Sequence, residues 1–153
     1  MLLHTFSHVQ GIGFARQQRL WSSGCRSWDD LLSGNFDQSL CGLSNAQLEL
    51  LRTEIERDKQ AFLARDIDHL SRRFKPSEHW RFYKHFFKGA VFLDIETTGT
   101  DPSSSLITVV GLYSRRGGPR VYIDGINLQN LPDDLSEFEI LVTFNGSSFD
   151  LPF

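Results

Sequence analysis

The residues of this sequence best placed to do chemistry are two carboxylates one residue apart, Asp94 and Glu96. They follow the apolar run 90–93 and precede the turn formers 97–99. Because alternate side chains of a β-strand point to the same face, a strand here places both acids side by side. Neighbouring carboxylates repel each other and lose solvation, a cost that a cation between them offsets. Hard divalent ions prefer such oxygen ligands, so the pattern predicts a divalent metal site.

A second acidic element lies near the end of the sequence. Residues 140–144 predict another strand, and Ser147 or Ser148 can cap a following helix that carries Asp150 in its first turn. If this strand runs parallel to the first, the turn after it lies beside the carboxyl end of the first strand. We therefore expect Asp150 to face the first two acids.

The elements between these acids predict how they are positioned. Apolar, β-branched runs predict strands, and Pro132 at a first helical position predicts a short helix in a crossover. The expected order is an antiparallel three-strand meander, a helical crossover and a parallel strand, which is an α/β arrangement. The predicted strands are 91–97, 106–113, 120–124 and 140–144, with the crossover over 127–139.

The first part of the chain predicts a helical region over residues 1–88, followed by an α/β domain over 89–153. Ser44 and Gln47 form a capping box that opens a helix running to about residue 65, with apolar residues at helical spacing. We interpret this helix as a packing or connecting element. A shorter helix is expected after Gly13, with Phe14, Gln18 and Trp21 on one side.

Two segments of the helical region could contact nucleic acid. The Gly11–Gly13 hairpin resembles a helix-hairpin-helix element, whose backbone N–H groups receive a phosphate, and Arg16 could add charge to that contact. A purely structural turn explains the hairpin equally well. Residues 72–88 interleave basic and aromatic side chains, as single-stranded nucleic acid requires. Packing of Trp80, Phe82, Phe86 and Phe87 against the sheet is the favoured interpretation of that segment.

Composition narrows the class of protein. The 153 residues, 40% hydrophobic, suffice for one modest domain with an appended piece. Cys25 and Cys41 have no metal-ligand or disulfide spacing, and the start of the sequence does not resemble a signal peptide. We expect a soluble, cytoplasmic protein that does not insert into membranes. The net charge of −3 combines a basic first part of the chain with an acidic second part. This distribution is consistent with a basic region that binds a polyanion beside an acidic metal site.

The two acidic motifs carry a family resemblance. The sequence FLDIETTG resembles the first motif, and FNGSSFD the second motif, of the DEDD 3′–5′ exonuclease superfamily, which has an RNase H-like fold. With the GIG leader the chain looks closest to the YprB-like branch, and it is also similar to the proofreading domains of family B DNA polymerases. The resemblance implies a two-metal nuclease, using Mg²⁺ or Mn²⁺, that hydrolyses phosphodiester bonds of nucleic acid from the 3′ end.

The family's residue roles transfer to matching positions only. Asp94, Glu96 and Asp150 correspond to three catalytic, metal-binding carboxylates. The residues implied to position the terminal nucleotide are Thr97, Thr98, Gly99, Asn145 and Phe149.

Two departures from the family pattern shape a second hypothesis. Thr100 replaces the leucine that usually follows the first motif, and the sequence ends before the family's third motif, which supplies the fourth carboxylate. A missing general base costs about 10²–10⁴-fold in rate. The alternative is therefore a non-catalytic nucleic-acid-binding module, or an inactive truncated remnant.

Overall fold

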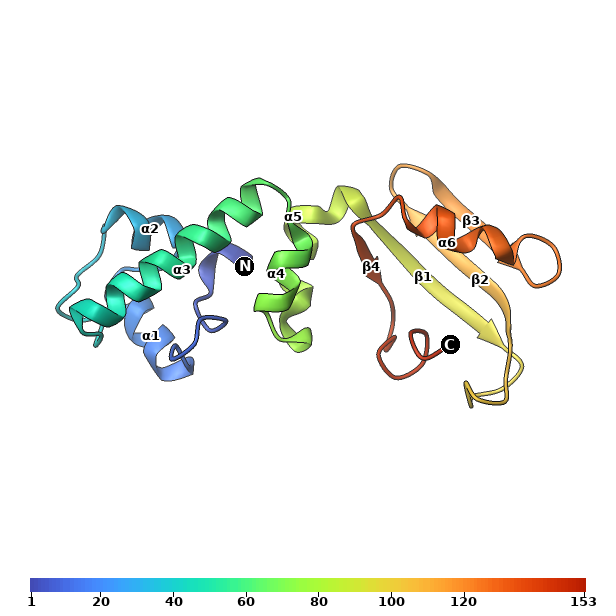
Figure 1. Ribbon diagram of the computed structural model, residues 1–153, viewed down its shortest axis with the longest axis horizontal. Helices are drawn as coiled ribbons and strands as arrows, with labels where there is room; N and C mark the ends of the chain where they lie inside the picture. Colours follow the sequence, from blue (N-terminus) through green and yellow to red (C-terminus); the bar gives the residue numbers. More distant parts are fainter. The chain divides into compact units, whose positions relative to one another are not determined.

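The computed structural model describes residues 1–153 and divides into two compact units, Met1–Phe82 and Tyr83–Phe153 (Figure 1). The first unit is helical, and the second contains a β-sheet. The division falls shortly before residue 88, where the sequence places the end of the helical region. Each unit has its own core, so each is described by itself.

Three helices of the helical unit begin at a residue whose side chain caps the helix. Ser27 caps α2 (Trp28–Ser33) by accepting a hydrogen bond from the Asp30 amide, and Asp66 caps α4 (Ile67–Arg73) by accepting one from the His69 amide. The elements of this unit are η1 (Leu2–His4), α1 (Phe14–Ser22), α2 (Trp28–Ser33), α3 (Asn45–Leu63), α4 (Ile67–Arg73) and η2 (Pro76–Arg81).

The longest helix, α3, confirms the predicted capping box. Ser44 Oγ accepts a hydrogen bond from the Gln47 amide, and Gln47 Oε1 accepts one from the Ser44 amide. Leu48, Leu51 and Ile55 are buried along one face, as their spacing predicts. The rest of α3 carries many charged side chains, and none of the helices in the structure has the length and apolar character needed to cross a membrane.

The predicted helix after Gly13 is α1, and the face that it buries is not the side that carries Phe14, Gln18 and Trp21. Gln17 and Leu20 are buried, whereas Phe14 is 75% exposed. Gln17 is buried because its side chain bonds the start of the chain. Its Oε1 atom accepts hydrogen bonds from Thr5 Oγ1 at 2.8 Å and from the Phe6 amide at 2.7 Å, which holds the start of the chain against α1. Before the Gly11 hairpin the structure contains only the 3₁₀ turn η1, so the first helix of a helix-hairpin-helix element is not formed.

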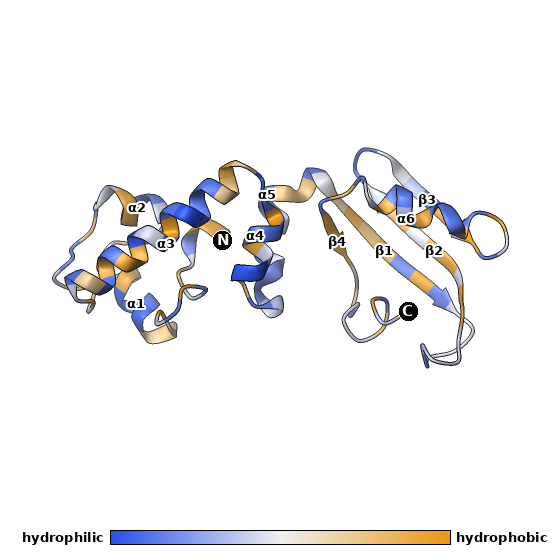
Figure 2. Cartoon of the chain, in the orientation of Figure 1, coloured by the Kyte–Doolittle hydropathy of each residue, from blue (hydrophilic) through white to orange (hydrophobic).

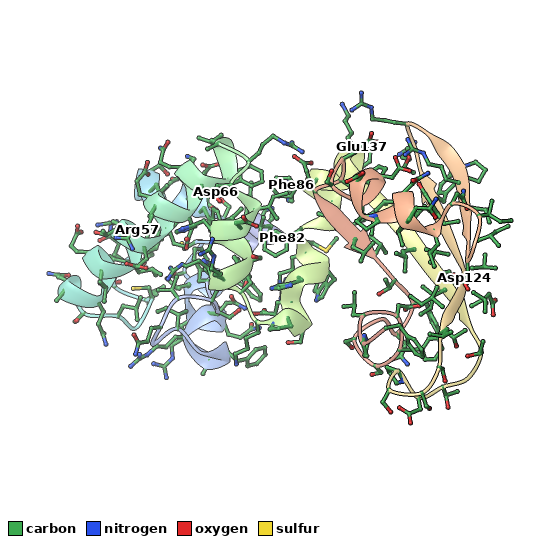
Figure 3. The ribbon with its side chains drawn as sticks, turned by 45° about the vertical axis from the view of Figure 1, so that its right-hand side comes forward. Arg57, Asp66, Phe82, Phe86, Asp124 and Glu137 are labelled. Carbon is green, nitrogen blue, oxygen red and sulfur yellow. The ribbon has the colours of Figure 1, made fainter.

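The basic and aromatic segment 72–88 divides between the two units. Phe82 is buried in the helical unit, where its ring lies 5.4 Å from that of Phe74, and Phe86, which belongs to the sheet unit, is 1% exposed (both are labelled in Figure 3). Trp80 is 56% exposed, with the Arg81 guanidinium 4.6 Å from its ring centroid. Packing against the sheet is therefore wrong for Phe82, which packs in the helical unit, and for the exposed Trp80. For Phe86 and Phe87 it stays a prediction.

The sheet unit has the predicted topology. The strands lie in the order β3 (Gly118–Ile123), β2 (Ile107–Ser114), β1 (Ala90–Thr97) and β4 (Ile140–Val142). The pairs β1–β2 and β2–β3 are antiparallel, and β4 pairs with β1 in parallel. Two short elements, α5 (Tyr83–Phe86) and η3 (Phe87–Gly89), lead into β1. The remaining elements are β1 (Ala90–Thr97), β2 (Ile107–Ser114), β3 (Gly118–Ile123), η4 (Leu128–Asn130), α6 (Leu131–Leu135) and β4 (Ile140–Val142).

One face of this sheet forms the core of the unit. Val91, Leu93 and Ile95 of β1 meet the inward residues of β2 and β3, and side chains of the crossover pack over them. The crossover residues in this layer are Leu128, Leu131, Leu135 and Phe138. Figure 2 shows β1 as mostly hydrophobic in its first half, with hydrophilic positions toward its carboxyl end. The predicted α/β fold class is confirmed.

Candidate active site

Asp94 and Glu96 lie on the face of β1 opposite the core. The burial of β1 alternates, so that Leu93 and Ile95 are buried while the two acids between and beyond them are exposed. Neither carboxylate takes part in a hydrogen bond or an ion pair within the fold. The pair therefore has the predicted common face and carries oxygen atoms that no protein group satisfies.

The neighbouring strand leaves space beside Asp94. Gly111 of β2 is its partner in the register, and it is a residue without a side chain in the middle of a β-branched run. A Cβ atom on Gly111 would meet only the Asp94 carbonyl oxygen, at 3.9 Å, so the glycine leaves open space on this face. At the register shift between Glu96 and Thr97, Thr108 Oγ1 donates a hydrogen bond of 3.0 Å to the Glu96 carbonyl, which fixes the end of β1.

The turn after β1 is held by its own side chains. Thr97 Oγ1 donates to the Gly99 carbonyl at 2.5 Å, and Thr98 Oγ1 accepts from the Leu106 amide at 3.0 Å. A Cβ atom on Gly99 would lie 2.7 Å from Ser105 Oγ, so glycine permits this close approach. The turn is thus a fixed rim beside the two acids.

The segment around Asp150 differs from its prediction. The strand β4 ends at Val142 and not at residue 144, and residues 146–152 form turns in place of the expected helix. The positive φ of 57° at Asn145 turns the chain, and the Leu151 amide donates to the Gly146 carbonyl at 2.8 Å. Local turn bonds therefore take the place of a capped helix.

Asp150 is buried in this turn, with 8% of its surface exposed. The rings of Phe149 and Phe153, 5.3 Å apart, flank it in the sequence and pack against the hydrophobic core. The Oδ2 atom of Asp150 is buried without a hydrogen-bond partner. A buried carboxylate oxygen in this condition is costly, and a missing ligand is one of the few explanations for it.

The three acids have the chemistry that a metal site requires, but not the positions. Their donor chemistry fits a hard divalent ion, since all three offer carboxylate oxygens that the protein leaves unbound. Their positions do not yet form a site, because no group of three or more His, Cys, Asp or Glu side chains lies close enough to hold an ion. The assignment of Asp94, Glu96 and Asp150 as joint ligands therefore stays a prediction.

The glycine hairpin of the helical unit is closed by its own arginine. Gly11 has a φ of 85°, and Arg16 Nη1 donates a hydrogen bond of 2.6 Å to the Gly11 carbonyl. This contact gives Arg16 a structural role in the hairpin. The nucleic-acid contact predicted for Gly11, Gly13 and Arg16 stays a prediction.

The mixed sheet and its crossover form an α/β arrangement that is consistent with an RNase H-like fold. Residues 91–153 match the family model of the RNase_H superfamily, so the match falls on the part of the chain that forms the sheet. No curated protein and no solved structure matches the chain. The match covers all but the first residue of the sheet and includes all three acids, and the helical unit lies outside it.

Proposed function

We propose that the sheet unit is a nuclease domain that hydrolyses phosphodiester bonds of nucleic acid from a 3′ end. One observation carries the proposal: two partner-free carboxylates share the exposed face of β1, the strand with which the segment matching the RNase_H superfamily begins. A structural role does not explain them, because exposed acids with no bond or ion pair contribute little to stability. The resemblance to DEDD exonucleases supplies the expected direction of attack.

Asp94, Glu96 and Asp150 are the proposed ligands of two Mg²⁺ or Mn²⁺ ions. Such ions, when bound, activate a water molecule and stabilise the leaving oxygen. Because the three acids do not form one group, the proposal requires the turns at 146–152 to bring Asp150 toward β1 when an ion binds. These turns are held to the chain by few backbone hydrogen bonds, including that from Ser148 to Asn145 at 3.0 Å.

The residues beside the acids are proposed to hold the terminal nucleotide. The rim Thr97–Gly99 offers backbone groups and hydroxyls next to Glu96. Asn145 is exposed on the turn that precedes Asp150, where its amide can reach a substrate. Phe149 is half-buried against the core and offers one ring edge as the wall of a base pocket.

Paired metal-dependent assays test the function. Asp94→Asn and Glu96→Gln keep the size of each side chain and remove its charge, and the exposed Asp124→Asn, in the loop after β3, is the matched control. With 5′-labelled single-stranded DNA or RNA and Mn²⁺, we expect hydrolysis to fall more than about 100-fold in the two β1 variants and to stay unchanged in the control. Strands with a blocked 3′ end should resist hydrolysis.

Three outcomes of these assays contradict the proposal in different ways. If the Asp94→Asn variant hydrolyses the strand as fast as wild type, Asp94 is not a metal ligand of the reaction. If strands with a blocked 3′ end are cleaved, hydrolysis does not start at the 3′ end, and only that part of the proposal is wrong. Salt-sensitive binding in EDTA without any Mn²⁺-dependent hydrolysis identifies a binding module in place of an enzyme. Substituting Arg16 by alanine then shows whether the glycine hairpin contributes to that binding.

A further inference from the structure

The basic residues of the sheet unit are concentrated at one end. Residues 83–153 contain nine acidic residues and only five basic ones, yet four of the five lie near the start of β1 and the turn that joins β2 to β3. The register places these segments together, because Val91 pairs with Ser114 and Ser114 with Gly118 (Figure 1). A local excess of positive charge in an otherwise acidic unit is a feature that the proposed active site does not use.

Three of these four side chains are exposed and form no ion pair: Lys88, Arg115 and Arg116. We call them the basic turn cluster. The Arg115 guanidinium lies over the ring of Phe87, with its Cζ atom 5.3 Å from the ring centroid. An arginine held against an aromatic ring loses less conformational freedom when it binds a ligand than a freely moving one.

The cluster borders two concave surfaces. One, of about 510 Å³, is lined by Phe87 and by all three members of the cluster. The other, of about 440 Å³, has Lys88 and Arg116 on its edge together with Arg120, Ser114 and Glu137. Positively charged walls around a hollow of this kind suit an anionic group that needs more than one donor.

The fourth basic residue, Arg120, pairs with the nearby acids, so these acids do not pair with the basic turn cluster. Arg120 lies 3.4 Å from an Asp134 oxygen and 3.5 Å from a Glu137 oxygen, so it neutralises the acids at the end of the crossover. Glu137 is labelled in Figure 3, beside α6. Because Arg120 occupies these carboxylates, Lys88, Arg115 and Arg116 remain available to an outside anion.

We propose that the basic turn cluster binds backbone phosphates of the nucleic-acid strand, at a distance from the carboxylates that carry the chemistry. The inference rests on the proposed function for the identity of the anion, since a polynucleotide is the polyanion that an RNase H-like domain handles. Six residues of β1 separate the cluster from Glu96, which corresponds to about 20 Å along the strand. The cluster thus holds a strand upstream of its reacting end.

Binding measured without hydrolysis tests this inference. Fluorescence anisotropy of a labelled single-stranded oligothymidylate, in EDTA and over a series of salt concentrations, reports phosphate contacts directly. Each lost contact removes about 0.7 from the slope of log K against log salt concentration for a single strand. The double variant Arg115→Gln/Arg116→Gln should therefore lose about 1.4 from this slope, which corresponds to an affinity about 25-fold lower near 0.1 M salt.

Two control variants separate phosphate binding from other causes. Arg26→Gln/Arg57→Gln removes the same net charge from exposed positions of the helical unit and should change neither the slope nor the affinity. Arg115→Lys/Arg116→Lys keeps the charge and should retain most of the slope. Equal losses in both glutamine variants would show a general charge effect, and no loss in the Arg115→Gln/Arg116→Gln variant would overturn the inference.

The failure of this inference is distinguishable from failure of the proposed function. If the Arg115→Gln/Arg116→Gln variant binds normally while Asp94→Asn abolishes hydrolysis, the basic turn cluster is not a phosphate site and the nuclease remains. If the wild-type chain does not bind the strand in EDTA at any salt concentration, the inference is wrong whatever the hydrolysis assay gives.

Discussion

Two buried aspartates, one in each unit, have opposite surroundings. Asp58, on α3 of the helical unit, is completely buried and accepts hydrogen bonds from His8 Nε2 at 3.0 Å, His69 Nε2 at 3.1 Å and Arg73 Nε at 3.0 Å. Asp150, in the sheet unit, is almost as buried, yet its Oδ2 atom has no partner. The first carboxylate is fully used by the fold, and the second is not.

This difference separates a structural acid from a candidate ligand. Burial alone would raise the pKa of Asp58, but hydrogen bonds from His8 and Arg73 outweigh it and lower the pKa to about 2. The Asp58 network joins the start of the chain to α3 and α4, so it stabilises the helical unit. Asp150 has no such network, and its Oδ2 atom is available to a group from outside the fold.

The largest expected effect comes from removing Asp58. Asp58→Ala leaves Arg73, His8 and His69 without their shared acceptor, and breaking a buried pair in this way costs about 3–5 kcal/mol. Tryptophan fluorescence during urea unfolding measures the loss, because all three tryptophans of the chain lie in the helical unit, at positions 21, 28 and 80.

Asp68→Ala provides the matched control for this measurement. Asp68 is an exposed aspartate in the first turn of α4, where its charge is worth less than about 1 kcal/mol. If both alanine variants lose the same small amount, the Asp58 network is not the tie between the helices, and the contrast with Asp150 disappears.

The pH dependence of stability gives the next largest effect. The folded-state pKa of Asp58 is about 2, below its ordinary value of 3.8, so the unfolded state binds a proton more readily. The stabilisation is complete above pH 3.8 and is lost as the pH falls toward 2, by about 2 kcal/mol in total. Urea unfolding of wild type and Asp58→Ala across this range should show the two stabilities converging in acid. Parallel curves would contradict the assigned role.

Much of the sheet unit could be predicted from the sequence, because period-two patterns identify strands and crossover lengths restrict the topology. The pattern of β1 also placed Asp94 and Glu96 on one face. The surroundings of Asp150 were not predictable in this way. Turn formers such as Asn145 and Gly146 predict a break in the chain, but the competition between a capped helix and local turn bonds depends on tertiary packing of Phe149 and Phe153.

The Asp58 network shows a second limit of sequence reasoning. Asp58 lies three residues after Ile55, so helical spacing places it on the buried face of α3, but the sequence does not show which groups satisfy its carboxylate. Its partners His8 and Arg73 lie 50 and 15 residues away. Contacts at such separations depend on how helices pack, and a single sequence carries no signal for them.

The smallest effect on stability is expected at Asp150, and it is the most informative. Asp150→Asn keeps the shape of the side chain and removes a buried charge that no protein group satisfies, so the sheet unit should be unchanged or about 1 kcal/mol more stable without metal. Near-ultraviolet circular dichroism of tyrosine follows this unit, since all three tyrosines, at 83, 113 and 122, lie in it. If Asp150 is a ligand, Mn²⁺ stabilises the wild type and the Asp124→Asn control alike but has a weaker effect on Asp150→Asn. Strong destabilisation of Asp150→Asn without metal would instead make Asp150 a second structural acid like Asp58, and the proposed metal site would then lose its third ligand.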